Sequence, residues 1–258
     1  MARGLALREA RWLLEEFGAD PARLERAVAR RLGGEPLQYV IGHWPFRGLD
    51  LLVDSRALIP RPETEELVGV ALGELARSGV RAPHLLDLGC GTGAIGLSLL
   101  SELAERGVRA SLVALDASED ALDLARENAR RHAITAVAFV RSDWFDELDL
   151  TLMGRFDLIV ANPPYVGAEE LVDAQPELAH EPRTALLSED TAAGAGFADL
   201  AEIIERAPTW LCEGGVLVCE HGAHQGRAAL AAARAAGFAE VRDVTDMAGH
   251  ARILVARS

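Results

Sequence analysis

The sequence predicts an α/β fold built on a mostly parallel sheet of seven strands, and three observations support this prediction. After Pro83, short apolar runs alternate with amphipathic segments of helical spacing. A glycine-rich turn joins the first apolar run to the first of these helical segments, as in a strand-to-helix connection. Half of the 258 residues are apolar, which is enough to bury a complete core.

The N-terminal segment predicts a short helical lobe. Apolar residues recur near helical spacing over 5–17, and Gly18 ends this first helix. Asp20 and Pro21 suit an N-cap and a first helical position, so we expect a second helix over 21–32. A pair of helices this short is expected to form a lobe rather than an independent domain.

The next segment predicts a linker that contains a β-hairpin. Short apolar runs at 39–41 and 49–53 are separated by Gly42 and Gly48, which is the pattern of two strands and a turn. We therefore divide the chain into three parts: a helical lobe over residues 1–32, a linker with a hairpin over 33–62, and the main domain over 63–258.

The main domain begins with a helix and then alternates strands with helices. Helices are expected at 63–76, 94–106, 119–132, 199–211 and 225–236. Strands are expected at 84–88, 111–116, 136–140, 156–161, 215–220, 241–245 and 252–256. The last two strands are joined by 246–251, which is too short for a helical crossover, so they should pair antiparallel.

Composition narrows the class of protein. Acidic residues outnumber basic ones by 40 to 26, and a formal charge of −14 repels polyanions, which argues against nucleic acid as a partner. The three cysteines form no pair or metal-ligand cluster, so we expect no metal and reduced thiols in the cytoplasm. The sequence has neither the apolar core of a signal peptide nor a run long enough to span a membrane.

The glycine-rich turn predicts a site for a nucleoside-containing cofactor. Its glycines allow backbone N–H groups to approach a ligand closely, and Asp116 at the end of the next strand can accept hydrogen bonds from both ribose hydroxyls. These features fit either S-adenosylmethionine or NAD, and a plain strand-to-helix turn is the alternative. The candidate loop residues are Gly89, Cys90, Gly91, Thr92 and Gly93.

A second candidate for the cofactor site follows the third strand. Asp143 could accept a hydrogen bond from an exocyclic adenine amine, and Trp144 could cover the adenine ring. The alternatives are a turn cap for Asp143 and core packing for Trp144.

The strand at 156–161 runs directly into Asn162, Pro163, Pro164 and Tyr165, which we interpret as the catalytic loop. Two prolines remove two N–H donors and leave a rigid row of acceptors, including the Asn162 side-chain oxygen and the Pro163 carbonyl. Two such acceptors can hold both N–H groups of a planar amide or amine beside a methyl donor, and Tyr165 can stack on the flat group. An ordinary turn is the alternative.

The chain resembles the HemK-type protein-(glutamine-N5) methyltransferases. The resemblance runs from about Gly33 to the C-terminus and rests on motifs that agree in order. These are Gly-Glu-Pro-Leu-Gln-Tyr at 34–39, Leu-Ile-Pro-Arg-Pro-Glu-Thr-Glu at 58–65, the glycine loop, Ser-Asp-Trp-Phe at 142–145, Asn-Pro-Pro-Tyr at 162–165, Glu-Pro-Arg-Thr-Ala-Leu at 181–186 and Glu-His-Gly at 220–222.

The resemblance implies a Rossmann-like class I methyltransferase. Such an enzyme uses S-adenosylmethionine to methylate the glutamine of the Gly-Gly-Gln motif in class I peptide chain release factors, which act in translation termination. The resemblance also implies that Asn162 and the Pro163 carbonyl bind the glutamine amide, and that Asn162 lies beside the cofactor as well. Arg61, Glu63 and Glu181 lie in family motifs without a role that we can derive from the residues. The N-terminal lobe is shorter than the helical bundle of the family.

Two other functions remain open. A nucleic-acid methyltransferase that acts on an exocyclic amine would use the same loop but should carry a basic groove. A nucleotide-binding module or an NAD enzyme would need a hydride-transfer site, for which His221 and His224 are candidates by residue type alone. A glutamine methyltransferase with a different protein substrate is a variant of the main interpretation.

Overall fold

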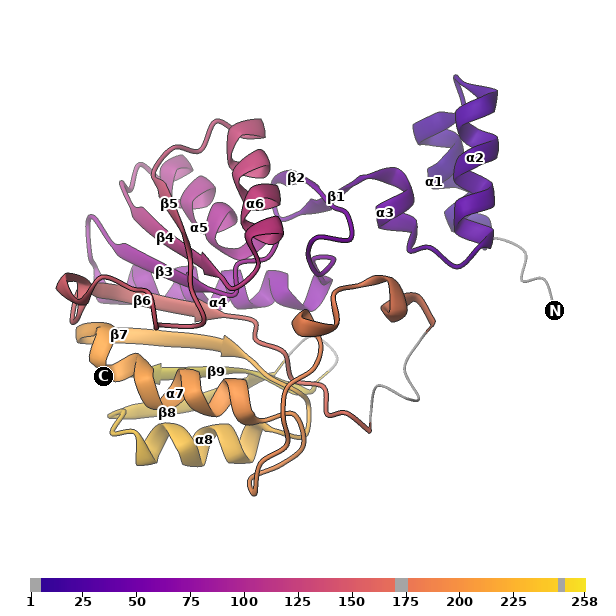
Figure 1. Cartoon of the computed structure of the whole chain (residues 1–258). Coiled ribbons are helices and arrows are strands. Elements are labelled where there is room, and N and C mark those ends of the chain that lie inside the picture. Colours follow the sequence, from indigo (N-terminus) through magenta and orange to yellow (C-terminus); the bar gives the residue numbers. More distant parts are fainter. Residues whose placement is uncertain (1–5, 170–175, 246–248) are drawn as a thin grey trace.

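The computed structural model describes residues 6–169, 176–245 and 249–258. Its centre is a seven-stranded sheet with the strand order β5-β4-β3-β6-β7-β9-β8 (Figure 1). The strands are β3 (His84–Leu88), β4 (Ser111–Asp116), β5 (Val137–Arg141), β6 (Phe156–Ala161), β7 (Leu211–Glu220), β8 (Glu240–Thr245) and β9 (Ala251–Arg257). β9 runs antiparallel to β7 and to β8, as the short connection predicts, and the pairs from β5 to β7 are parallel.

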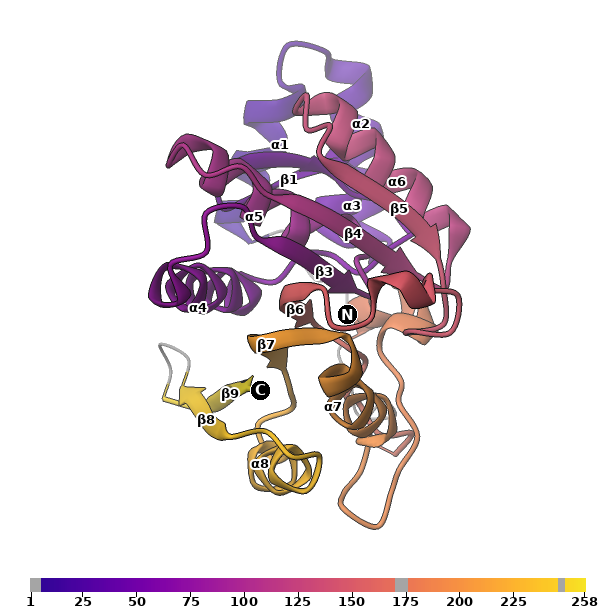
Figure 2. The same cartoon turned by 90° about the vertical axis from the view of Figure 1, so that its left-hand side faces the viewer.

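Helices cover both faces of the sheet (Figures 1 and 2). One face is covered by α4 (Pro62–Ser78), α5 (Ala94–Glu105) and α6 (Glu119–Arg131), and the other by α7 (Ala198–Trp210) and α8 (Gly226–Ala235). Side chains of neighbouring residues in a strand point to opposite faces of the sheet and pack into different cores. Leu85 packs with the first helix layer and Leu86 with the second, which is why these strands read as continuous apolar runs.

The prediction for the first strand of the hairpin in the linker was wrong. Residues 39–41 are not the first strand of the hairpin but part of a short helix, α3 (Leu37–Ile41), which ends at Gly42 with φ +88°. The hairpin is formed instead by β1 (His43–Phe46) and β2 (Leu49–Leu52). The reason is tertiary: the helical turn directs Leu37 and Val40 into the core of the lobe, while Tyr39 packs against Val53 and Ile59 further along the linker.

The N-terminal lobe consists of α1 (Leu7–Phe17) and α2 (Pro21–Leu32), and it packs on α3 beside the main domain (Figure 1). Asp20 caps α2, since its side chain accepts hydrogen bonds from the backbone N–H groups of Ala22 and Arg23. The predicted helix over 5–17 begins at Leu7, and residue 5 lies outside the described residues. No helix in the described part of the chain is long and apolar enough to cross a membrane.

Candidate active site

The carboxyl ends of four neighbouring strands meet at one edge of the sheet, and the motifs singled out in the sequence follow these strands. Leu88 of β3 pairs with Leu115 of β4 and with Ala161 of β6, so the three strands end at the same level. Ligands of parallel α/β sheets bind outside such ends. A cavity of about 470 Å³ lies there, which is in the range of roughly 300–1,000 Å³ that small-molecule sites occupy.

The glycine loop forms one wall of this cavity with its backbone. Gly89 and Gly91 have φ of +67° and +54°, a region that side chains rarely adopt. The N–H of Cys90 donates to the carbonyl of Leu115 at 2.8 Å, which attaches the loop to β4. A Cβ at Gly89 would lie 3.4 Å from the Trp144 ring, so glycine there lets the indole approach the loop.

Asp116 is held rigidly at the end of β4. Its carboxylate accepts hydrogen bonds from the N–H of Gly91 at 2.8 Å and of Ser118 at 2.9 Å. Burial raises the pKa of this carboxyl, and the two backbone hydrogen bonds act in the opposite direction. Each carboxylate oxygen can accept a further hydrogen bond, so Asp116 can receive two hydroxyl groups of a ligand in the cavity that it lines.

The segment after β5 adds an aromatic surface. Trp144 adopts φ +42°, and its indole N–H donates to Asp199 of α7 at 3.1 Å. Trp144, the exposed Asp143 and Asp199 all line the cavity, while Trp144 also packs against the second core. Trp144 thus has the core contact of the alternative interpretation and also lines the cavity, while its contact with a cofactor stays a prediction.

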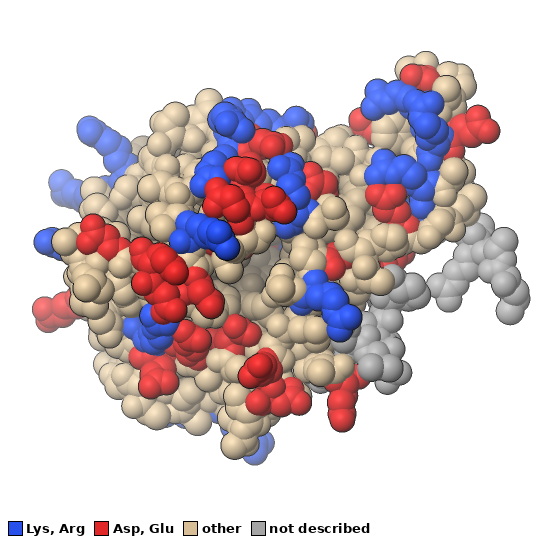
Figure 3. All heavy atoms as spheres, viewed as in Figure 1, with Lys and Arg blue, Asp and Glu red and all other residues tan. Residues whose placement is uncertain are grey.

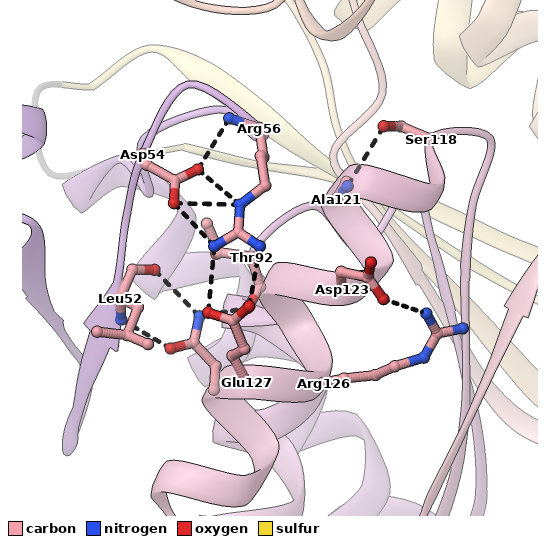
Figure 4. Close-up of polar contacts among 10 residues, drawn as sticks. Leu52, Asp54, Arg56, Thr92, Ser118, Ala121, Asp123, Arg126 and Glu127 are labelled. Carbon is pink, nitrogen blue, oxygen red and sulfur yellow. Dashed lines mark hydrogen bonds and ion pairs between the residues drawn. The ribbon is translucent and has the colours of Figure 1, made fainter.

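The segment that follows the hairpin lines the cavity together with the glycine loop, and Figure 4 shows how it is held. Arg56 pairs with Asp54 at 2.8 Å and with Glu127 of α6 at 3.0 Å. The buried Asn128 side chain accepts from the N–H of Leu52 and donates to the Leu52 and Thr92 carbonyls. These contacts fasten the linker to α6 and to the glycine loop.

A second cavity, of about 550 Å³, adjoins the first. Asn162 lines both cavities, Pro164 lines the first, and Pro163 and Tyr165 line the second. The second cavity is otherwise lined by the linker and by residues of 177–186, where the chain forms two short 3₁₀ turns. The Asn-Pro-Pro-Tyr loop thus forms the boundary between two spaces, of which only the first contains the glycine loop.

The far end of this loop is fixed by backbone contacts. The side-chain N–H₂ of the buried Gln225 donates to the carbonyls of Tyr165 at 3.3 Å, Ala195 at 2.8 Å and Gly196 at 3.0 Å. Gly196 has φ +60°, and a Cβ there would lie 2.4 Å from the Tyr165 carbonyl oxygen. The loop therefore depends on a glycine and a glutamine that follow it by about thirty and sixty residues.

Arg61 and Glu181 connect two segments around the second cavity. The Glu181 side chain is only 2% exposed, and its carboxylate accepts from the Arg61 guanidinium at 2.5 Å and from the N–H of Ile59 at 3.0 Å. This pair fastens the linker to the segment at 181–186, a role that the sequence did not reveal. Glu63 is exposed on the first turn of α4.

A chain of hydrogen bonds leads from Asn162 into the protein. The Asn162 side-chain N–H₂ donates to the Thr64 hydroxyl at 3.1 Å, and this hydroxyl donates to Glu220 at 2.8 Å. Burial raises the pKa of the Glu220 carboxyl to about 7, and the Thr64 hydrogen bond opposes this rise.

Most of the predicted site residues line one of the two cavities. Gly93 does not; it is the left-handed N-cap of α5, where a Cβ would lie 2.8 Å from Leu97. The predicted residues that line a cavity are Gly89, Cys90, Gly91, Thr92, Asp116, Asp143, Trp144, Asn162, Pro163, Pro164 and Tyr165.

Sequence reasoning missed several residues of the site. Arg56 lies in the linker and Thr64 in the first turn of α4, where no glycine or strand end marks them. Asp199 begins α7 and could have been interpreted as an ordinary first-turn acid. Gln225 carries no signal except its place shortly after the Glu-His-Gly motif. In the described residues, no group of three His, Cys, Asp or Glu side chains could hold a metal ion.

Comparison with known proteins decides the family. A methyltransferase domain family matches residues 81–251. The release factor glutamine methyltransferase of Aliivibrio fischeri is 38% identical over 239 residues, which cover 93% of this chain and 78% of the relative. The protein of the same name from Vibrio cholerae is 42% identical over 233 residues, or 90% and 77% of the two chains. The chain belongs to the release factor glutamine methyltransferase family.

The fold of this family member is shared more widely. The hMettl16 catalytic domain, solved in complex with the MAT2A 3′UTR hairpin 6, superposes with a TM-score of 0.61 at 13% identity and covers 99% of this chain and 93% of that chain. This likeness concerns the fold alone.

The residues around the first cavity fit S-adenosylmethionine, the donor expected of this family. A nucleoside needs an acceptor for its ribose hydroxyls, and Asp116 lines the cavity with its carboxylate already oriented. The indole of Trp144 supplies a flat apolar surface, and Gly89 and Gly91 remove side chains from the loop between them. The cavity lining combines these groups with Asn162, so the methyl donor and the acceptor loop can meet there.

Proposed function

We propose that this enzyme transfers a methyl group from S-adenosylmethionine to the side-chain amide nitrogen of the glutamine in the Gly-Gly-Gln motif of class I peptide chain release factors. Membership of the release factor glutamine methyltransferase family supports the substrate and the reaction. The observation that carries the proposal within the structure is the position of Asn162, which lines both cavities. One cavity can take the donor and the other can take the glutamine.

On the donor side, the first cavity supplies the binding groups. We propose that Asp116 accepts the ribose hydroxyls, Asp143 accepts from the adenine amine, and Trp144 covers the ring. The loop residues Gly89, Cys90, Gly91, Thr92 and Gly93 would shape the wall through their backbone. The bound cofactor supplies a methyl group activated by its sulfonium charge.

On the acceptor side, the amide nitrogen of glutamine is a weak nucleophile because its lone pair is delocalised. Two acceptors, the Asn162 side-chain oxygen and the Pro163 carbonyl, would hold its two N–H groups, with Pro164 and Tyr165 shaping the slot. Fixing both hydrogens favours a pyramidal nitrogen, so these hydrogen bonds strengthen toward the transition state. Orientation of this kind can contribute roughly 7–11 kcal/mol to the lowering of the barrier.

We propose the same three parts that the sequence suggests: a lobe over residues 1–32, a linker over 33–62 and a catalytic domain over 63–258. The second cavity faces the linker, because Pro36 and Gln38 line it together with Glu177. Arg31 of the lobe pairs with Glu177 at 2.5 Å. These contacts support the proposal that a release factor approaches beside the lobe, and translation termination implies a cytoplasmic enzyme.

The test is transfer of label from S-adenosylmethionine to a purified release factor, followed by tandem mass spectrometry of the Gly-Gly-Gln peptide. We expect label on that glutamine, and none on a release factor with asparagine in its place. Asn162→Ala should lower turnover by roughly 100-fold or more, while cofactor affinity measured by calorimetry stays within about threefold. Equal loss of turnover and of cofactor affinity would assign Asn162 to the cofactor site instead.

A folded, cofactor-binding enzyme that leaves the release factor unlabelled would overturn the proposed substrate. Labelling of DNA or ribosomal RNA in the same assay would then favour an exocyclic base amine. The charge distribution argues against that outcome. The formal charge is −14, and basic and acidic side chains alternate on the face drawn in Figure 3 rather than forming a continuous basic groove.

A further inference from the structure

We propose that Thr64 and Glu220 are positioning residues that determine which end of the Asn162 amide faces the substrate. The inference rests on the proposed function, because it concerns the residue that is assigned there to the glutamine amide. Neither residue needs to touch the substrate, since both act through the orientation of Asn162.

The three side chains come from separate elements and meet in the interior. Asn162 follows β6, Thr64 lies in the first turn of α4, and Glu220 is the last residue of β7. Ala161 of β6 pairs with Cys219 of β7, so Asn162 and Glu220 follow at equivalent positions on neighbouring parallel strands. Thr64 is 4% exposed and Glu220 is 3% exposed, which leaves little room for water to replace either hydrogen bond.

The hydrogen-bonding capacity of each group fixes the direction of the chain. An ionised carboxylate only accepts, so the single hydroxyl hydrogen of Thr64 is used toward Glu220, 2.8 Å away. The Thr64 oxygen can then only accept from Asn162, 3.1 Å away. Only the N–H₂ end of an amide can donate, so the flipped amide would place two oxygen atoms against each other at that distance.

The consequence for catalysis follows from the other end of the amide. With its N–H₂ group engaged by Thr64, Asn162 must turn its Oδ1 atom away from Thr64. That atom makes no hydrogen bond to the described residues, and Asn162 lines both cavities. An oxygen can accept an N–H of the substrate amide, whereas the N–H₂ group of a flipped side chain would repel it. The buried glutamate therefore selects an acceptor rather than a donor for the reaction.

The state of Glu220 should also make the selection depend on pH. Burial raises the pKa of this carboxyl to about 7. The charged or titratable groups around it are Arg252 of β9, the adjacent His221, Glu63 of α4 and Tyr165 of the catalytic loop. Protonated Glu220 can donate as well as accept, so the direction of the chain is then no longer fixed. Turnover should fall as the pH drops below about 7, because part of the enzyme can then present the wrong end of Asn162.

The first experiment removes the hydroxyl and restores it. Thr64→Val should lower kcat on the intact release factor by roughly 5- to 30-fold, the effect of one lost buried hydrogen bond, with cofactor affinity unchanged. Thr64→Ser keeps the hydroxyl and should retain kcat within about threefold. Ser98→Ala removes a buried hydroxyl of α5 that has no hydrogen-bond partner in the described residues, so it serves as the matched control with wild-type kcat. Equal losses in the valine and serine variants would overturn the positioning role.

The second experiment changes the acceptor. Glu220→Gln can donate or accept at every pH, so its kcat should be lower than the wild-type value at pH 8, and its profile should lack the acid limb near pH 7. A wild-type profile that is retained in the glutamine variant would show that Glu220 does not set the direction of the chain.

A third experiment measures the orientation of the Asn162 side-chain amide without any methyl transfer. In the cofactor-free enzyme labelled with ¹⁵N-asparagine, one Asn162 side-chain N–H should exchange slowly with solvent, and it should exchange rapidly in Thr64→Val. Rapid exchange in both proteins would refute the proposed hydrogen bond. If slow exchange is found but the release factor is not methylated, the proposed function fails while the orientation of Asn162 stands.

Discussion

Asp116 shows how much a single side chain can depend on backbone donors. Its two oxygens each accept one N–H, from Gly91 and from Ser118, so the carboxylate connects the glycine loop to the start of α6. An ionised carboxylate can accept these two bonds and still accept hydroxyls from a ligand. An amide of the same shape cannot, because one of its ends is a donor.

Asp116→Asn should therefore weaken binding of S-adenosylmethionine by roughly 10- to 100-fold. The asparagine has no charge to strengthen its hydrogen bonds with the ligand, and its N–H₂ end cannot accept the backbone N–H that one Asp116 oxygen accepts now. Isothermal titration calorimetry at fixed pH measures the effect directly. Asp120→Asn is the matched control, because Asp120 is exposed in the first turn of α6, lines neither cavity and makes no side-chain hydrogen bond to the described residues. If both variants bind equally well, Asp116 is not the ribose acceptor.

The segments around the second cavity are ordered by contacts from outside themselves. The linker at 58–61 is held by Glu181, and the Asn-Pro-Pro-Tyr loop is held by Gln225 and by its close approach to Gly196. Neither segment belongs to a regular helix or strand that would fix it through its own hydrogen bonds. Two predictions follow from these contacts.

Removing the Glu181 carboxylate should loosen the substrate side of the site. Glu181→Ala leaves the buried N–H of Ile59 and the guanidinium of Arg61 without their acceptor, at a cost of about 1–3 kcal/mol in unfolding free energy. We expect a higher KM for the release factor with unchanged cofactor affinity. Glu181→Gln keeps an acceptor for Ile59 and should lie between alanine and wild type. A raised cofactor Kd in place of a raised KM would contradict this assignment.

Gly196→Ala should displace the catalytic loop, because its Cβ would lie 2.4 Å from the Tyr165 carbonyl oxygen and its φ of +60° disfavours a side chain. We expect a loss of about 1–3 kcal/mol in urea denaturation together with a loss of most turnover. Gly73→Ala in α4, where an added Cβ would meet no atom within 4 Å, should instead stabilise the protein by about 0.5–1 kcal/mol. A Gly196→Ala variant with wild-type stability and turnover would show that the backbone can relax there without consequence.

Across the whole molecule, burial raises the pKa of three carboxyl groups and so couples their protonation to folding. Burial raises the pKa of Asp87 to about 7, and the hydrogen bond from the Gly96 N–H only partly offsets this. Glu220 and Asp116 shift in the same direction. Asp87 and Glu220 thus bind more protons in the folded protein than in the unfolded chain between about pH 4 and pH 7, so their contribution to the unfolding free energy falls as the pH rises through that window.

We predict that Asp87→Asn flattens this dependence. A single group contributes at most about 1.4 kcal/mol per pH unit, so the difference between wild type and variant should change steadily from pH 5 to pH 7 and level off above. Chemical denaturation at pH 5, 6, 7 and 8 measures it. Parallel curves for the two proteins would mean that Asp87 keeps its ordinary pKa in the folded state.

The sequence alone predicts the sheet well, because its strands are buried on both faces. The bounds expected for β3, β4 and β6 agree with the structure, since each apolar run ends at a glycine or a polar residue, namely Gly89, Asp116 or Asn162. The same rule places the glycine loop, Asp116, Trp144 and Asn162 at one edge before any coordinates are known. Local chemistry is enough for these features, because residues close together in the chain determine each of them.

Contacts between distant residues determine the rest. The short run at 39–41 fits a strand or a helical turn equally well, and packing against the lobe on one side and against the rest of the linker on the other makes it helical. Thr64 lies 98 residues from Asn162 and 156 from Glu220, so no spacing rule connects the three. Hydrogen bonds between side chains depend on where the folded elements meet, which a pattern of apolar and polar residues along the chain does not encode.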